Sequence, residues 1–191
     1  VKPKIKSNIG GWQSYEEMFA EGHGFEDVRT ELCLALLNLQ KTVGINGYWA
    51  LNAMWININF PHATNSIHDH LANPNEGHHN LLTGVLWVKT LPNSGDLRLY
   101  NCRCEQEMYG FFKDVEHIKN SAYYDITPED GICYMFKASK AHEVTENFSG
   151  ENRISISFNF EILEESEAKK HGLPKNAIAY NDDMRPWNKN K

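Results

Sequence analysis

Near its C-terminal end the chain contains a strictly alternating segment, RISISFNFEI, at residues 153–162. In an extended strand successive side chains point to opposite faces. The apolar face then carries only isoleucine and phenylalanine, and the polar face carries Arg153, Ser155, Ser157, Asn159 and Glu161. The polar face either meets water, as in an ordinary half-exposed strand, or lines the interior of a barrel whose apolar outside is covered by helices.

The periodicity of the rest of the chain favours the barrel. Apolar residues recur every three or four positions from 25 to 43, which predicts a helix, and a shorter helix is predicted over 14–21. From Tyr48 onward the period changes to two. Strands are predicted over 48–60, 81–89, 96–100, 132–137 and 153–162. Helices followed by strands predict a mainly β, α+β domain, and those helices need a sheet face to cover.

The length of 191 residues predicts a single domain. We expect N-terminal helices over 1–46, the strand-rich core over 47–162 and a polar tail over 163–191. The net charge of -6 argues against a nucleic-acid partner. No apolar run approaches the roughly 20 residues of a membrane span, and no secretory signal is expected at the start. The oligomeric state is left open between monomer and homodimer.

The cysteines indicate a reducing compartment. Cys33, Cys102, Cys104 and Cys133 include no C-x-x-C pair and are too few for a disulfide scaffold. We expect four reduced thiols and a cytoplasmic location.

The histidines suggest a metal site. Five of the nine lie between residues 62 and 79. His68 and His70 are two apart, so in an extended strand both imidazoles can reach one metal while Asp69 points away. His142, which follows an apolar strand, is the candidate third ligand. We expect the remaining histidines to be surface or loop residues, including His78 and His79 in a loop rich in Gly, Asn and Pro.

A series of short motifs, each weak alone, is more specific in its order and spacing. The motifs are WININ at 55–59, HxH at 68–70, TGVLWV at 83–88, PNSGDL at 92–97, PxxG at 128–131, His142, and RISISFN at 153–159. Together they resemble the iron(II)/2-oxoglutarate-dependent oxygenases common in marine phage genomes, a branch near the prolyl 4-hydroxylases. The resemblance covers about residues 48 to 162.

The resemblance implies a double-stranded β-helix, that is, a jelly-roll, cupin-like core supported by N-terminal helices. It implies an Fe(II) site at His68, His70 and His142. The carboxylate of the cosubstrate 2-oxoglutarate would lie against Arg153 and Ser155. The implied activity is an O2-dependent hydroxylation of a C–H bond, with prolyl or other peptidyl side chains as a substrate class, coupled to decarboxylation of 2-oxoglutarate to succinate. A phage-encoded enzyme would act in the host cytoplasm.

The chain departs from the family pattern at three places. His70 stands where the wider superfamily has a carboxylate, and a local twist of the strand could bring Asp69 to the metal instead. The loop after Leu71 is long, so His78 or His79 could approach the metal or cap the entrance. Trp87 replaces a tyrosine that touches the cosubstrate, and an indole can only donate a hydrogen bond.

Two other functions fit the same residues. A cupin-like three-histidine dioxygenase would not use 2-oxoglutarate, and Arg153 would bind the carboxylate of its substrate. A metal-free jelly-roll binding module would carry the His-x-His motif by coincidence. Candidate cavity-lining residues on the predicted strands are Asn57, Asn59, Arg98, Tyr100 and Asn159.

Overall fold

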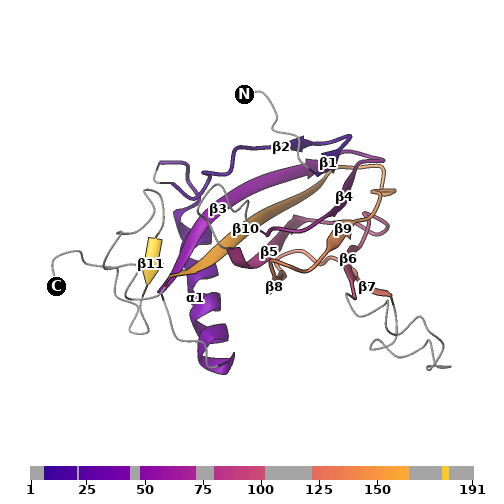
Figure 1. Cartoon of the computed structure of the whole chain (residues 1–191). Coiled ribbons are helices and arrows are strands. Elements are labelled where there is room, and N and C mark those ends of the chain that lie inside the picture. Colours follow the sequence, from indigo (N-terminus) through magenta and orange to yellow (C-terminus); the bar gives the residue numbers. More distant parts are fainter. Residues whose placement is uncertain are drawn as a thin grey trace, which may run out of the picture.

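The computed structural model contains two antiparallel β-sheets and one helix in the part of the chain that it describes (Figure 1). The described residues are 7–20, 22–43, 48–71, 80–101, 122–163 and 178–180. The chain is thus mainly β, as the change to a period of two predicts. His78, His79, His117, His171, Cys102 and Cys104 lie outside the described residues.

The larger sheet has the strand order β11-β3-β10-β5-β8, with β2 paired to the edge of β3. Its strands are β2 (Trp12–Gln13), β3 (Tyr48–Asn59), β5 (Asn80–Lys89), β8 (Cys133–Lys137), β10 (Arg153–Leu163) and β11 (Ile178–Tyr180). In the central strand β10, Ser155 pairs with Asn57 on one side and with Trp87 on the other. Because paired residues share a face, these three side chains lie on the same side of the sheet.

The smaller sheet has the order β1-β4-β9-β6-β7. Its strands are β1 (Asn8–Ile9), β4 (Thr64–His68), β6 (Leu97–Tyr100), β7 (Tyr123–Ile126) and β9 (His142–Val144). Leu97 and Leu99 pack against Val85 and Trp87 of the larger sheet and form a buried cluster with them. The polar face of β10 therefore looks towards the other sheet rather than into water.

The outer face of the larger sheet is covered by α1 (Glu26–Val43). Leu32, Cys33 and Leu36 of the helix are buried in one cluster with Phe158 and Phe160 of β10. The prediction that helical residues cover the apolar face of the alternating strand is confirmed. Burial of each large apolar side chain stabilises such a layer by roughly 1.5–3 kcal/mol.

The helix predicted over residues 14–21 is wrong, and the described part of the chain has one N-terminal helix rather than several. The segment instead runs along the edge of β3. Ser14 N donates to Ile56 O at 3.0 Å, Met54 N to Glu16 O at 2.7 Å and Met18 N to Met54 O at 3.1 Å. Main-chain groups that pair with a neighbouring strand cannot also form helical hydrogen bonds, so the sheet edge determines this conformation.

Part of the predicted polar tail joins the larger sheet, because β11 pairs with β3.

Cys33 and Cys133 are free of disulfides to any residue in the described ranges. Burial raises the pKa of Cys33 to about 12 and that of Cys133 to about 11. None of the described helical residues forms a segment long and apolar enough to cross a membrane. The division of the chain at residues 46 and 162 remains a prediction.

Candidate metal centre

His68 and His142 are brought together by the pairing of β4 with β9. The two residues are direct partners in this antiparallel ladder, and His142 also pairs with Leu99 of β6. His68 Nδ1 lies 2.6 Å from Ser66 O, and His142 Nδ1 lies 2.9 Å from Lys140 O. Because a carbonyl can only accept, each Nδ1 carries the proton, which leaves each Nε2 with a lone pair for a metal.

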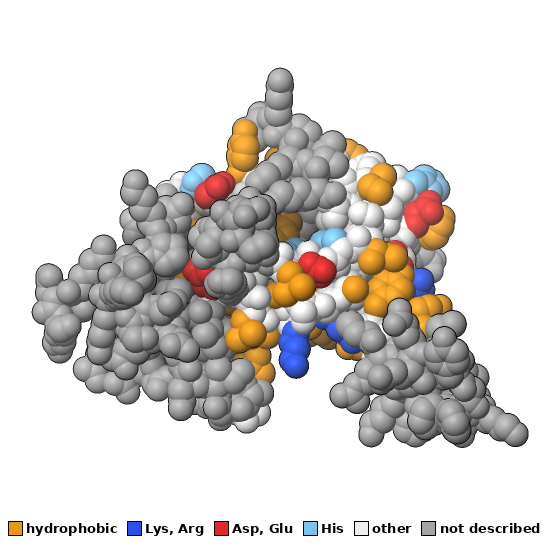
Figure 2. All heavy atoms as spheres, viewed as in Figure 1, with side chains coloured by type: hydrophobic (Ala, Val, Ile, Leu, Met, Phe, Trp, Pro, Cys, Tyr) orange, Lys and Arg blue, Asp and Glu red, His pale blue; other side chains and the backbone are white. Residues whose placement is uncertain are grey.

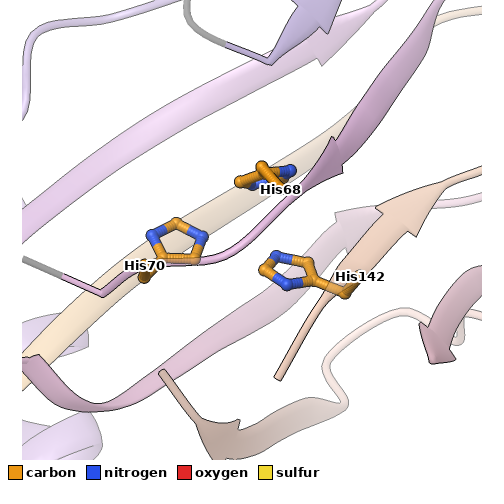
Figure 3. A group of neighbouring side chains, drawn as sticks. All are labelled: His68, His70 and His142. Atoms are coloured by element: carbon orange, nitrogen blue, oxygen red, sulfur yellow. The ribbon is translucent and has the colours of Figure 1, made fainter. Parts of the chain in front are cut away.

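His70 lies two residues beyond His68, just past the end of β4, and its ring completes the group. Its imidazole stacks on that of His142 with centroids 5.1 Å apart, and its centroid is 4.9 Å from that of His68. One ligand nitrogen from each of the three residues lies within 4.8 Å of those from the others. The three rings face a common point (Figure 3).

The neighbouring carboxylate is not part of this group. Asp69 is exposed, and its Oδ1 accepts a hydrogen bond from Leu71 N at 3.1 Å. Three imidazole nitrogens suit a divalent transition metal such as iron, and a set of three neutral ligands leaves the full charge of that ion uncompensated.

Burial keeps the two strand histidines in the form that binds metal. Desolvation, and then the nearby His68, lower the pKa of His142 to about 4, although its bond to Lys140 O opposes the shift. Desolvation also lowers the pKa of His68, against the opposing effects of Ser66 O and Asp69. His142 is therefore neutral at pH 7 and needs no deprotonation before it coordinates a metal.

The three histidines line a pocket between the sheets, with about 400 Å³ of space not filled by atoms, part of it open to solvent. Histidine side chains are visible in a hollow near the centre of the space-filling view (Figure 2). Arg153, Ser155, Trp87, Asn57 and Asn59 line the same pocket. The prediction that the polar face of the alternating strand faces a cavity is confirmed for its first two polar residues.

Arg153 is fully buried, and only one part of its guanidinium group is bound to protein. Nη1 donates to Ser94 O and, at 3.3 Å, to Thr145 O. Nε and Nη2 have no hydrogen-bond partner among the described residues. Burial lowers the pKa of Arg153 to about 10, against the opposing charge of Asp96, so the group remains positive at pH 7. A buried cation with two open donors fits an anion that accepts two hydrogen bonds.

A further open donor lies close by. Trp87 Nε1 is buried, and the described part of the chain offers it no acceptor. The guanidinium carbon of Arg153 lies 5.7 Å from the centre of the Trp87 ring, and the Ser155 hydroxyl is on the residue paired with Trp87. These donors fit the carboxylate of a cosubstrate.

Three of the candidate cavity-lining residues, Arg98, Tyr100 and Asn159, are not among the described residues that line the pocket. Arg98 and Tyr100 are excluded because β6 turns Leu97 and Leu99 inward. Arg98 instead binds the Asp125 carboxylate through Nε and Nη2. The carbonyls that hold Arg153 were also missed, because no side-chain pattern marks a main-chain acceptor. The sequence marks this contact only through Gly95 of the PNSGDL motif. The main chain passes so close to Arg153 there that a Cβ on residue 95 would lie 2.7 Å from Nη1.

Comparison with known proteins identifies a family that matches this chain. The model of a family described as "Putative 2OG-Fe(II) oxygenase" matches residues 53–159. No curated protein matches the chain.

Solved structures with the same fold include two prolyl hydroxylases. The prolyl-4-hydroxylase of Pseudomonas putida has 15% identity and a TM-score of 0.52, with 80% of this chain and 72% of that chain covered. The viral collagen prolyl hydroxylase of Paramecium Bursaria Chlorella virus-1, solved with 2-oxoglutarate, has 13% identity and a TM-score of 0.53, with 83% and 81% covered. HygX from Streptomyces hygroscopicus, solved with nickel and 2-oxoglutarate, has 10% identity and a TM-score of 0.54, with 85% and 74% covered. At these identities the likeness establishes the fold.

Proposed function

The chain belongs to the 2OG-Fe(II) oxygenase family, and from this premise we propose that it is an iron(II)- and 2-oxoglutarate-dependent dioxygenase that hydroxylates a C–H bond. One observation carries the proposal. Three imidazoles with ligand nitrogens within 4.8 Å of one another line a pocket that is also lined by Arg153, a buried cation with two open N–H donors. A metal site beside a carboxylate site is what this chemistry requires.

In this proposal His68, His70 and His142 hold the iron. These residues fit iron because three imidazole nitrogens suit this metal. The Nδ1 atoms of His68 and His142 bond to main-chain carbonyls, which leaves their Nε2 atoms for the metal. Phe136 packs edge-on against His142 at 4.8 Å, and Trp55 stacks on His70 at 5.6 Å. These aromatic neighbours restrict the rings and limit the access of water to the ligands.

Arg153, with Ser155 and Trp87, holds the carboxylate of 2-oxoglutarate farthest from the metal. Nε–H and Nη2–H lie on one edge of the guanidinium plane, so together they match the two oxygens of a carboxylate. The carbonyls of Ser94 and Thr145 hold the opposite nitrogen and fix the direction of this edge. The chain thereby orients the cosubstrate before any reaction.

Iron(II), 2-oxoglutarate and O2, when bound, supply the chemistry that hydroxylates the substrate and converts 2-oxoglutarate to succinate and CO2. The protein contributes three ligands, an anchor for one carboxylate and a partly apolar pocket. Val85, Leu97 and Val144 form the apolar wall and keep it poor in water.

We further propose a prolyl or other peptidyl side chain as the substrate class. The support is that prolyl hydroxylases are among the structures with this fold, which is an argument by analogy. The same proposal includes a phage origin, action in the host cytoplasm and a monomeric or homodimeric state.

A second candidate is a three-histidine dioxygenase that does not use 2-oxoglutarate. It is favoured by His70, which occupies the place of the carboxylate in the usual triad of two histidines and one acid. In that case Arg153 binds the carboxylate of the substrate itself.

The test is succinate release from 2-oxoglutarate with added Fe(II), in the wild type, His142→Ala and Arg153→Ala. We expect slow iron-dependent release in the wild type and none in either variant. Because some such enzymes need their substrate, Ni(II) and 2-oxoglutarate binding are measured in parallel. Ni(II) binding without 2-oxoglutarate binding would favour the second candidate, and the absence of both would overturn both functions.

A further inference from the structure

Two asparagine side chains form a relay that ends on the main chain of His70. Asn52 Nδ2 donates to Asn80 Oδ1 at 2.7 Å, and Asn80 Nδ2 donates to His70 O at 2.9 Å. The orientation of both amides is determined, because the His70 carbonyl can only accept. Asn80 must therefore turn its NH2 towards His70 and its oxygen towards Asn52.

The sheet places these asparagines at two irregularities on either side of β10. The β3–β10 pairing shifts at Phe160 and leaves Asn52 as the extra residue. The β5–β10 pairing shifts beside the same residue and leaves Leu81 unmatched next to Asn80. Asn52 and Asn80 lie on β3 and β5, which flank β10, and strands two apart are separated by about 9–10 Å. A bulge can redirect a side chain, which allows the two amides to meet across β10.

His70 needs such support because it lies beyond its strand. His68 and His142 are held by the ladder in which they pair. The main chain of His70 is held by its N–H, which donates to Ala138 O at 2.9 Å, and by the bond from Asn80 to its carbonyl. The two contacts hold the peptide groups before and after the His70 Cα and so restrict the rotation of the chain at this residue.

We propose that Asn80, held by Asn52, is a positioning residue of the metal centre that makes His70 the second ligand in place of Asp69. The proposal rests on the proposed function, in which the three histidines bind iron. Successive side chains of an extended segment point in opposite directions, so a rotation of the chain at this point would exchange the two candidates. With the His70 carbonyl fixed, the imidazole faces His142, and the Asp69 carboxylate turns outward to Leu71 N.

The experiment is a double-mutant cycle on Ni(II) affinity, measured by isothermal titration calorimetry. The four proteins are the wild type, Asn80→Ala, His70→Ala and the double variant. We expect Asn80→Ala to weaken Ni(II) binding about 10-fold to 100-fold, the range found for residues that orient metal ligands. In the His70→Ala background the same substitution should change the affinity less than twofold, because its effect is transmitted through His70.

Asn38→Ala, at an exposed position of α1, is the matched control and should leave Ni(II) affinity unchanged. An unchanged affinity in folded Asn80→Ala, or an equal loss in both backgrounds, would overturn the positioning role. If Asn80→Ala does not fold, Asn52→Ala decides by the same cycle, with a smaller loss expected. Failure of the wild type to bind Ni(II) would instead refute the proposed function on which the relay depends.

Discussion

The guanidinium of Arg153 offers a sharp quantitative test, through the substitution Arg153→Lys. The wild-type side chain has two open N–H donors on one edge and is held from the other by Ser94 O and Thr145 O. Lysine keeps the positive charge but lacks the planar fork. We therefore expect it to replace two charge-assisted hydrogen bonds to the cosubstrate with one.

The magnitude follows from the number of donors lost. A hydrogen bond to a charged group contributes about 1.5–3 kcal/mol, and every 1.4 kcal/mol is about tenfold in affinity. The Kd for 2-oxoglutarate should rise by about 10-fold to 150-fold. Ni(II) affinity in the absence of 2-oxoglutarate should not change, because Arg153 is not a proposed ligand.

The assay is calorimetric titration of the Ni(II)-loaded protein with 2-oxoglutarate, with Ni(II) affinity and thermal melting as checks on the fold. Arg98→Lys is the control, because this arginine also makes a two-pronged contact with a carboxylate but lies outside the pocket. A Kd for Arg153→Lys within threefold of the wild type, in a folded protein, would refute the assignment of the open edge as the cosubstrate anchor.

Three further predictions test other parts of the site. His142 has a folded-state pKa of about 4 against 6.5 in the unfolded chain, so the metal-free protein should lose about 3 kcal/mol of stability as the pH falls from 6.5 towards 4. Urea denaturation at pH 7.5 and 4.5 measures this loss, and an equal loss in His142→Gln would contradict the cause. Gly95→Ala should lower the melting temperature and weaken 2-oxoglutarate binding, because φ is +88° and a Cβ would lie 2.7 Å from Arg153 Nη1. Gly131→Ala, with φ +79° and no atom within 4 Å of its Cβ, should lower only the melting temperature. Trp87→Phe removes the open Nε1 donor and should raise the Kd for 2-oxoglutarate about threefold to tenfold, with Ni(II) affinity unchanged.

The sequence determined the local features of this protein. Alternation along 153–162 predicted one apolar and one polar face, because side-chain direction in a strand depends only on residue parity. The order of helix and strands then favoured helical residues over the apolar face and a cavity beside the polar one. The His-x-His spacing and the motif order likewise indicated His68, His70 and His142 together, and the structure places these three residues around one point. Such patterns are visible in one dimension because they repeat with the geometry of the backbone.

Only the tertiary structure decided how each of these residues is held. Residues 14–20 lack a helix because β3 offers their main chain hydrogen-bond partners. The open edge of Arg153 exists because carbonyls of Ser94, before β6, and Thr145, after β9, hold its other nitrogen. The His70 carbonyl accepts a hydrogen bond from Asn80 of β5, which in turn accepts one from Asn52 of β3. In each case the partner lies on another segment and is a main-chain atom or an asparagine at or beside a bulge, and contacts between segments leave no periodic mark in the sequence.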